Sequence, residues 1–193
     1  MKNMLFIMNP KAGRTTLKNS LVDVLEVFCN NDYAVRTYLT KSADDAERIV
    51  QEEGANYDVI VCAGGDGTLG NTVTGYMKSG IRVPLGYIPC GSTNDFARSM
   101  DIPRETVEAA EMIVKAEPFS IDIGSLNDKN FVYVAAFGMF SDTSYATPQN
   151  MKNIFGHAAY VLQGIKSLAN VPSYKMKVTI DGDEQEGEFV FGV

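Results

Sequence analysis

The chain lacks several features that would assign it to a specialised class of protein. No run of 18 or more apolar residues occurs, so the sequence predicts no transmembrane helix. The apolar stretch near the first residue is too short for a signal peptide and is typical of a strand. Lysine and arginine form no block and the net charge is −7, which argues against nucleic acid as a partner.

Cysteine and histidine are scarce, and their spacing argues against a metal centre built from them. The three cysteines, Cys29, Cys62 and Cys90, are odd in number and show no metal-type spacing. Cys62 and Cys90 lie in or at the end of apolar runs, where a reduced thiol acts as a small hydrophobic group. This indicates a reducing, cytoplasmic compartment. His157, the only histidine, is expected to have a structural or surface role.

Short apolar runs alternate with amphipathic segments over the first 116 residues. The expected strands cover residues 4–8, 34–39, 59–63 and 84–88. Helices are expected to start at Thr15 or Thr16, after a Ser42 cap, directly after strand 59–63, and near Pro103. This alternation predicts an α/β fold with an open, doubly wound, mostly parallel sheet.

The pattern changes near Phe119, where a β-rich region is expected to begin. The expected elements there are a hairpin over 119–126 and 131–140, a helix over 157–169, and strands over 174–180 and 188–193. We therefore predict an α/β domain over 1–120 and the beginning of a β-rich second domain over 121–193. The chain stops within an apolar run, which is typical of a fragment whose second domain is incomplete.

The segment 58–68, DVIVCAGGDGT, has the pattern of a buried strand that ends in a phosphate-binding turn. Its three glycines can adopt positive φ and let a ligand approach the backbone closely. The helix that follows directs free N–H groups and the positive end of its dipole at the same place. Asp66 would repel a phosphate there unless a divalent cation lay between them, so the turn predicts phosphate and metal together.

Four turns are expected at the carboxyl ends of the strands, where doubly wound sheets bind ligands. They comprise residues 9–14, Thr40, residues 64–68 and residues 91–94, and they are rich in Gly, Ser, Thr and Asn. Tight turns need such residues in any case. Their convergence on one edge nevertheless favours a shared binding site.

A dinucleotide site is the obvious alternative, because residues 65–70 satisfy G-x-G-x-x-G between a strand and a helix. That fingerprint requires an acid at the end of the next strand, whereas this strand ends in Ile88-Pro89-Cys90. A Walker A loop is absent. The sequence thus predicts a nucleotide-phosphate site of neither common type.

Three ordered motifs resemble the diacylglycerol kinase catalytic-domain family: residues 9–13 (NPKAG), 64–69 (GGDGTL) and 89–98 (PCGSTNDFAR). Residues 121–124 and 144–148 are similar to the soluble bacterial diacylglycerol kinases. The resemblance implies the fold shared by NAD kinases and diacylglycerol kinases. It also implies ATP and Mg²⁺ as cofactors and a lipid hydroxyl as the phosphoryl acceptor.

The resemblance also implies roles for individual residues. The charge neutralisation that phosphoryl transfer needs points the same way: Asp66 is expected to be catalytic and to hold Mg²⁺. Asp122 at the domain junction either joins this metal site or is a strand-end residue that accepts loop amides. Lys11 and Arg14 either neutralise phosphate or are solvated loop cations. The expected nucleotide-binding residues are Asn9, Pro10, Lys11, Ala12, Gly13, Thr40, Gly65, Asp66, Gly67, Thr68, Leu69, Gly70, Asn71 and Ser92. The family commonly has Asn-Glu where this chain has Gly70-Asn71, so a carboxylate is missing. The general base is expected beyond Val193.

Three hypotheses follow. The first is an ATP-dependent lipid kinase acting on diacylglycerol or a related lipid alcohol, cytoplasmic and peripheral to the inner face of the membrane. The second is an NAD kinase, which shares GGDGT. The third is a nucleotide-binding module without catalysis. The fragment itself is expected to be inactive because it lacks the base, and an uncovered strand edge leaves a homodimer open.

Overall fold

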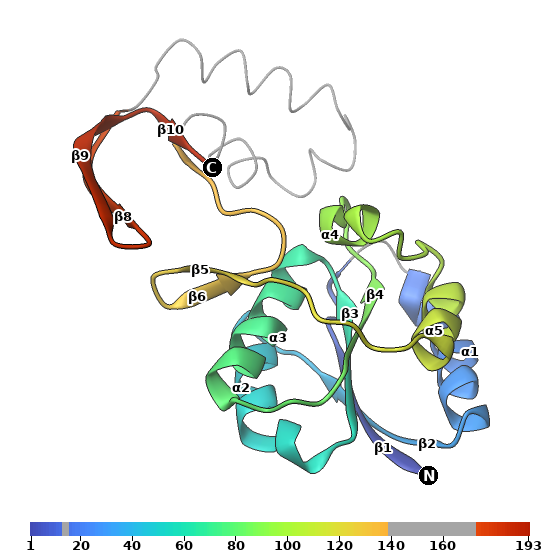
Figure 1. Cartoon of the computed structure of the whole chain (residues 1–193). Helices are drawn as coiled ribbons and strands as arrows, with labels where there is room; N and C mark the ends of the chain where they lie inside the picture. Colours follow the sequence, from blue (N-terminus) through green and yellow to red (C-terminus); the bar gives the residue numbers. More distant parts are fainter. Residues whose placement is uncertain (13–15, 139–172) are drawn as a thin grey trace. The chain divides into compact units, whose positions relative to one another are not determined.

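The computed structural model describes residues 1–12, 16–138 and 173–193 of the chain (Figure 1). These residues form two compact units, Met1–Tyr133 and Val134–Val193. Within the described residues, no helix is long and apolar enough to cross a bilayer. The predictions for the helix 157–169, His157 and the motif 144–148 lie outside the described residues, as do those for Gly13 and Arg14.

A four-stranded parallel sheet forms the centre of the first unit. Its strands are β1 (Lys2–Met8), β2 (Tyr33–Leu39), β3 (Val59–Gly64) and β4 (Leu85–Pro89), in the order β2-β1-β3-β4. The predicted strands and the α/β fold class are therefore confirmed. In this order the chain moves from one side of β1 to the other between β2 and β3. The carboxyl ends of β1 and β3 consequently lie at the point where the winding direction reverses.

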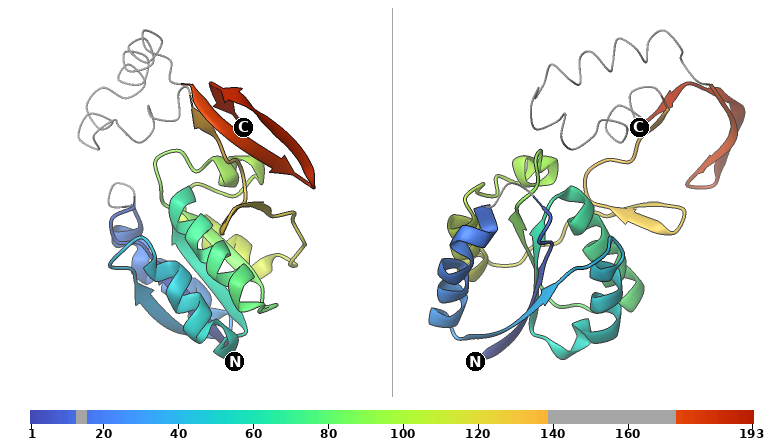
Figure 2. Two further views of the ribbon diagram at one scale, coloured as in Figure 1. Left: turned by 90° about the vertical axis from the view of Figure 1, so that its left-hand side faces the viewer. Right: turned by 180° about the vertical axis from the view of Figure 1, so that it is seen from behind.

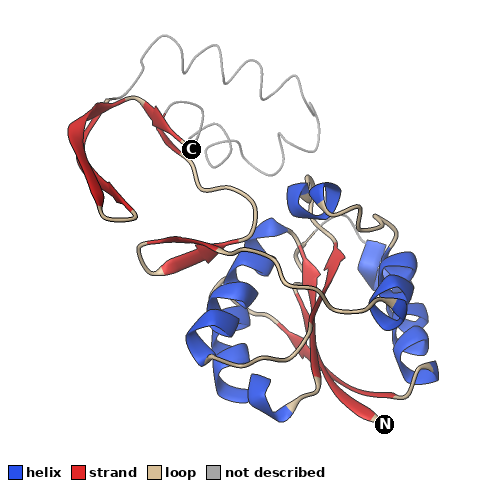
Figure 3. Cartoon of the chain, in the orientation of Figure 1, coloured by secondary structure: helices blue, strands red, loops and turns tan. Residues whose placement is uncertain are grey.

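Helices cover both faces of this sheet (Figure 2). They are α1 (Thr16–Asn30), α2 (Asp45–Glu53), α3 (Asp66–Ser79), α4 (Asp95–Ser99) and α5 (Thr106–Lys115), with a 3₁₀ turn η1 (Gly54–Asn56) after α2. Helices α1 and α5 pack together on one face, and α2 and α3 pack together on the other (Figure 3). The fold is thus doubly wound, as predicted.

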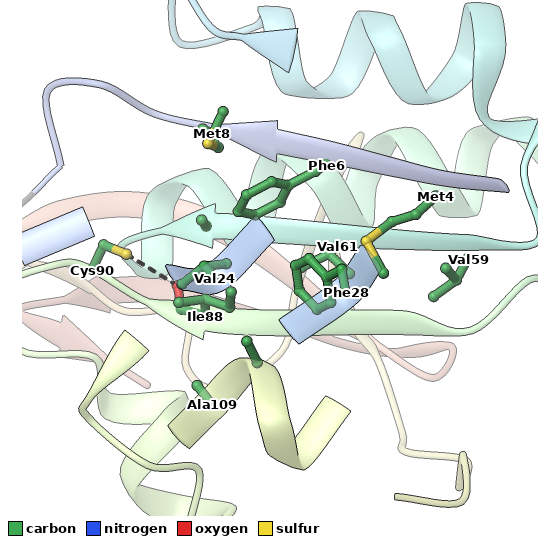
Figure 4. Packing of buried hydrophobic residues seen from close by; sticks show 12 residues of the cluster. Met4, Phe6, Met8, Val24, Phe28, Val59, Val61, Ile88, Cys90 and Ala109 are labelled. Carbon is green, nitrogen blue, oxygen red and sulfur yellow. Dashed lines mark hydrogen bonds between the residues drawn. The ribbon is translucent and has the colours of Figure 1, made fainter. Parts of the chain in front are cut away.

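The buried parts of the central strands, residues 4–8 of β1 and the whole of β3, are apolar because each has a core on both sides. Met4, Phe6 and Met8 of β1 pack on the α1–α5 side, and the alternate residues Leu5 and Ile7 pack on the α2 side. Figure 4 shows the first of these cores. There the Phe6 ring contacts that of Phe28 edge-on, with centroids 5.6 Å apart. This continuous burial holds β1 and β3 firmly beneath the loops that follow them.

Two helices begin later than the sequence patterns predicted. The N-cap of α2 is Asp44 rather than Ser42, because the Asp45 carboxylate accepts the N–H groups of Lys41 and Ser42 and holds them in the preceding turn. Helix α5 begins at Thr106, and its N-cap is Glu105. Pro103 therefore lies before the helix and not in its first turn.

A short hairpin, β5 (Gly124–Leu126) and β6 (Lys129–Phe131), belongs to the first unit. The Asn130 N–H donates to Thr74 Oγ1 of α3 (3.2 Å), and Lys129 Nζ pairs with Glu47 Oε2 of α2 (3.0 Å). These contacts join the hairpin to α2 and α3, and the first compact unit therefore extends to Tyr133. The division into domains after residue 120 stays a prediction.

The second unit contains only strands among its described residues. β7 (Phe137–Gly138) pairs with β10 (Phe191–Gly192), and β8 (Tyr174–Ile180) forms an antiparallel hairpin with β9 (Asp183–Phe189). The predicted strand 174–180 is confirmed. Its partner begins earlier than predicted, because Asp181 and Gly182 take positive φ and close a two-residue turn.

Candidate functional site

The candidate site lies at the carboxyl edge of the sheet, where β1, β3 and β4 end (Figure 1). In doubly wound sheets, ligands bind outside the carboxyl ends of the strands at the point where the strand order reverses. Here that point falls between β1 and β3. The loops after these two strands contain the first two of the three motifs.

Asn9 joins the first loop to the second. Its backbone N–H donates to Ala63 O of β3 (3.0 Å), and its side-chain Nδ2 donates to Thr68 Oγ1 (3.0 Å). The Asn9 Oδ1 accepts the N–H of Lys11 (2.9 Å), and the Lys11 side chain is exposed. The motif asparagine therefore fixes both its own turn and the start of α3.

Gly64 and Gly65 of the second loop let neighbouring parts of the protein lie close to the backbone, and neither has positive φ. Gly65 is the N-cap of α3 in an extended conformation, φ −91° and ψ −178°. Among the described glycines, only Gly80, Gly138 and Gly182 have positive φ. A Cβ on Gly64 would lie 2.5 Å from Thr68 Cβ. The expectation of positive φ in this turn was therefore wrong, because the strand passes directly into the helix.

Gly67 is different, because none of the described residues occupies the space beside it. A Cβ there would meet no heavy atom within 4 Å, and the residue is exposed in the first turn of α3. The helix N-terminus leaves backbone N–H groups without intrahelical partners at this place. Open space beside such amides is what a phosphate group requires.

The third loop lies directly against the second. A Cβ on Gly91 would come within 2.6 Å of Gly65 Cα, and the Cys90 N–H donates to Gly64 O (2.7 Å). Asn94, in the left-handed region at φ 52°, accepts the Gly91 N–H with Oδ1 (2.8 Å) and donates to Gly91 O with Nδ2 (2.9 Å). Ser92 is exposed on this loop.

Asp66 connects the second loop to α4. Its Oδ2 accepts the Asp95 N–H (3.2 Å) and its Oδ1 accepts the Phe96 N–H (3.4 Å). An ionised carboxylate has about four lone-pair sites, so these two bonds leave acceptor capacity on both oxygens. The side chain can therefore hold the third loop in place and still accept a cation or its water.

The remaining predicted residues lie at differing places. Thr40 is buried, and its N–H donates to Met8 O (2.9 Å), so it lies beside the end of β1. Asn71 Nδ2 donates to Ala43 O (2.8 Å), tying α3 to the loop after β2. Asp122 is exposed between α5 and β5, and within the described structure no hydrogen bond or ion pair joins it to the other predicted residues.

The described residues form no metal site made of protein side chains alone. Among residues 1–12, 16–138 and 173–193, no group of three or more His, Cys, Asp or Glu side chains is placed to hold an ion. The cysteines of this range are free thiols, as predicted, and burial raises the pKa of both Cys62 and Cys90 to about 12. These two thiols are therefore neutral hydrophobic groups. A Mg²⁺ ion held by one carboxylate, water and substrate phosphates needs no such cluster.

The sequence analysis missed two residues that organise the site, Tyr87 and Asn94. In the sequence, Tyr87 looks like one more apolar residue of a buried strand, and it lies outside all three motifs. Asn94 lies within the third motif, but a strand-to-helix turn alone does not reveal that its side chain binds its own loop. Asn and Asp side chains often hydrogen-bond to the backbone of their own turn, and an asparagine at this place was the one signal in the sequence.

The fold and the edge loops define the class: a doubly wound α/β domain with three hydrogen-bonded turns at its strand ends, the second of them rich in glycine. The profile of the family described as "Diacylglycerol kinase catalytic domain" matches residues 3–126. The chain belongs to this family.

Curated relatives and solved structures agree with this assignment. The chain is 35% identical over 191 residues to proteins named "Diacylglycerol kinase" from Staphylococcus aureus strains JH9 and Newman, a match that covers 97% of the chain and 60% of each relative. A crystal structure of a diacylglycerol kinase from Bacillus anthracis str. Sterne matches with a TM-score of 0.75 and 29% identity, covering 98% of this chain and 62% of that one. The chain thus spans less than two thirds of the length of these relatives.

Proposed function

We propose that the full-length protein is a kinase that transfers the γ-phosphoryl group of ATP to the hydroxyl of diacylglycerol or a related lipid alcohol. The observation that carries this proposal is the joining of three loops at the reversal point of the sheet. Asn9 contacts Thr68, Gly65 contacts Gly91, and Asp66 accepts amides of α4. Family membership supports the same reaction class.

The geometry suits phosphoryl transfer because this reaction depends on positioning and charge neutralisation. The free amides at the start of α3, beside the open space at Gly67, bind phosphate oxygens. Lys11 adds a positive charge from the neighbouring loop. The proposed nucleotide site also includes four residues at the same edge, Thr40, Gly65, Thr68 and Ser92. Its remaining proposed members are Pro10, Ala12, Gly13, Leu69, Gly70 and Asn71.

Asp66 is the proposed metal-holding and catalytic side chain, and Asp122 the proposed second acid. Mg²⁺ would neutralise the charge of the transferred phosphoryl group and of the leaving phosphates. The spare acceptor capacity of Asp66 fits this role. Two amides hold the carboxylate in a fixed direction, which is the preorganisation that charge stabilisation requires.

The proposed acceptor places the enzyme in the cytoplasm at the inner face of the membrane, with the general base and most of the lipid contacts beyond Val193. A homodimer is part of the same proposal. The 193-residue chain is expected to bind nucleotide but to phosphorylate no lipid.

The experiment compares full-length wild type with Asp66→Asn and Asp66→Ala, using radiolabelled ATP, Mg²⁺ and diacylglycerol in mixed micelles. The amide of Asp66→Asn keeps one acceptor oxygen for the α4 amides but loses the charge. We expect both variants to lose at least about 100-fold in turnover, with Asp66→Asn folded like wild type. Turnover of Asp66→Asn within a few-fold of wild type would refute the metal role.

A second candidate, an NAD kinase, is favoured by the shared GGDGT turn of residues 64–68. Offering NAD in place of diacylglycerol in the same assay separates the two. Phosphorylation of NAD alone would establish this alternative. Binding of ATP without transfer to either acceptor would indicate a non-catalytic nucleotide-binding module.

A further inference from the structure

Tyr87 connects the second and third loops from beneath. It lies in β4 at 5% exposure, packed with Cys62, Leu69 and Phe96. Its hydroxyl oxygen is 3.1 Å from Gly64 O and 3.4 Å from Asn94 Oδ1. Gly64 begins the second loop, and Asn94 ends the turn of the third.

The two acceptors share a single donor hydrogen, because a phenol carries only one. Gly64 O also accepts the Cys90 N–H, and Asn94 Oδ1 also accepts the Gly91 N–H. The Asn94 amide cannot turn away, since Nδ2 donates to Gly91 O at the same time. The phenol thus lies at the centre of a buried set of polar groups drawn from both loops.

The hydroxyl remains a donor at all ordinary pH values. Burial raises the pKa of Tyr87 well above its usual range, and the nearby charge of Asp66 raises it further. Removing this hydroxyl leaves Gly64 O with the Cys90 N–H and Asn94 Oδ1 with the Gly91 N–H, so the hydrogen bond that joins the two loops through the phenol is lost.

We propose that Tyr87 is a positioning residue that holds the second and third loops in the one arrangement that binds a triphosphate. This inference rests on the proposed function. Tyr87 touches no reacting group; it acts through Gly64 and Asn94, whose loops carry the amides that face the phosphates.

The chain contains a matched control for the same chemical change. Tyr76 of α3 donates its hydroxyl to Val83 O (2.8 Å), and burial also raises its pKa. Val83 precedes β4, so this hydrogen bond lies at the amino edge of the sheet, away from all three loops. Tyr76→Phe and Tyr87→Phe therefore remove the same kind of bond at opposite ends of the same layer.

The test measures calorimetric affinities for Mg-ATP and for adenosine in the wild-type chain and both variants. Because one hydrogen bond contributes about 1 kcal/mol, Tyr87→Phe should weaken Mg-ATP binding roughly five-fold and leave adenosine binding unchanged. Both variants should lower the melting temperature by a similar amount, because each loses one hydrogen bond. Tyr76→Phe should change neither affinity. Equal affinities for Mg-ATP in Tyr87→Phe and wild type, or an equal loss for adenosine, would overturn the inference.

Amide hydrogen exchange in the free protein separates this inference from the proposed function. Exchange at Cys90 and Gly91 should accelerate roughly five-fold in Tyr87→Phe and remain unchanged in Tyr76→Phe. Wild type that binds no Mg-ATP would refute the proposed function, and the exchange rates would still decide the coupling. Unaltered exchange at both amides refutes the coupling whatever the nucleotide result.

Discussion

Two of the three glycines of helix α3, Gly67 and Gly75, have completely different surroundings. Gly75 lies against α2, where a Cβ would be 2.4 Å from the backbone oxygen of Glu47. Gly67, two turns earlier, faces open space. A helical glycine is about 1 kcal/mol less favourable than alanine, so each needs a reason. Packing supplies the reason at Gly75, and no contact with residues 1–12, 16–138 or 173–193 supplies one at Gly67.

The two halves of α3 therefore serve different ends. The half after Gly70 is fixed by packing, by the Lys78–Glu47 ion pair (2.7 Å) and by the bond from Asn130 to Thr74. The half before it is fixed by polar contacts to neighbouring loops, through Thr68 and Asp66. One end of the helix holds the fold together, and the other is the end that we propose binds phosphate.

Gly75→Ala should produce the largest change in stability. The added methyl group meets backbone atoms, which cannot rotate away, so α2 and α3 must separate. Overpacking of this kind costs about 1–3 kcal/mol, which corresponds to a fall in melting temperature of several degrees. Thermal unfolding followed by circular dichroism measures it. A melting temperature equal to that of wild type would show that α2 and α3 accommodate the methyl group without cost, and packing would then not explain Gly75.

Gly67→Ala should have the opposite effect on the fold and a strong effect on binding. The helical backbone accepts alanine, so we expect stability to rise by roughly 0.5 kcal/mol. The methyl group occupies the space proposed for phosphate, so Mg-ATP affinity should fall at least about ten-fold. Calorimetry and thermal unfolding of the same samples give both numbers.

Val22→Ala is the control for Gly67→Ala. Val22 is 73% exposed in the middle of α1, and alanine there also raises helix propensity. It should raise stability slightly and leave Mg-ATP affinity unchanged. If Gly67→Ala behaved like Val22→Ala in both respects, the open space at Gly67 would have no role in binding.

The smallest expected effect concerns Glu47, which tests the structural half of α3 through pH. Hydrogen bonds from Lys78 and then from Lys129 hold the pKa of this carboxyl below its ordinary value of 4.5. A lowered pKa stabilises the fold above pH 4.5, and this stabilisation is lost as the pH falls through the lowered pKa. Partly exposed pairs contribute at most about 1 kcal/mol each.

Urea unfolding at pH 7 and pH 3 measures this contribution in wild type and Glu47→Gln. The variant should be less stable at pH 7, and the difference should shrink at pH 3. A difference independent of pH would show that the loss comes from packing and not from charge.

The sequence predicted most of the fold because its signals are local. Apolar runs such as 59–63 mark buried strands, and the turns after them follow from the parallel order. The start of α2 was misplaced because the Asp45 carboxylate accepts the N–H groups of Lys41 and Ser42, which keeps Ser42 in the turn before the helix. Positive φ was the wrong reason for the glycines at 64 and 65. Gly64 is required by its closeness to Thr68, and Gly65 by its closeness to Gly91, and neither contact can be inferred from the local sequence. Tyr87 was missed because only the folded structure brings Gly64 and Asn94 together.

If the three loops form one phosphate-binding site, titration of the isotope-labelled chain with Mg-ATP, followed by amide NMR, will show all three responding together. We expect the chemical-shift changes to concentrate in residues 9–12, 64–71 and 91–96, while Tyr76 and Val83 at the opposite edge stay unchanged. Shifts confined to one loop, or centred on the opposite edge, would contradict this expectation.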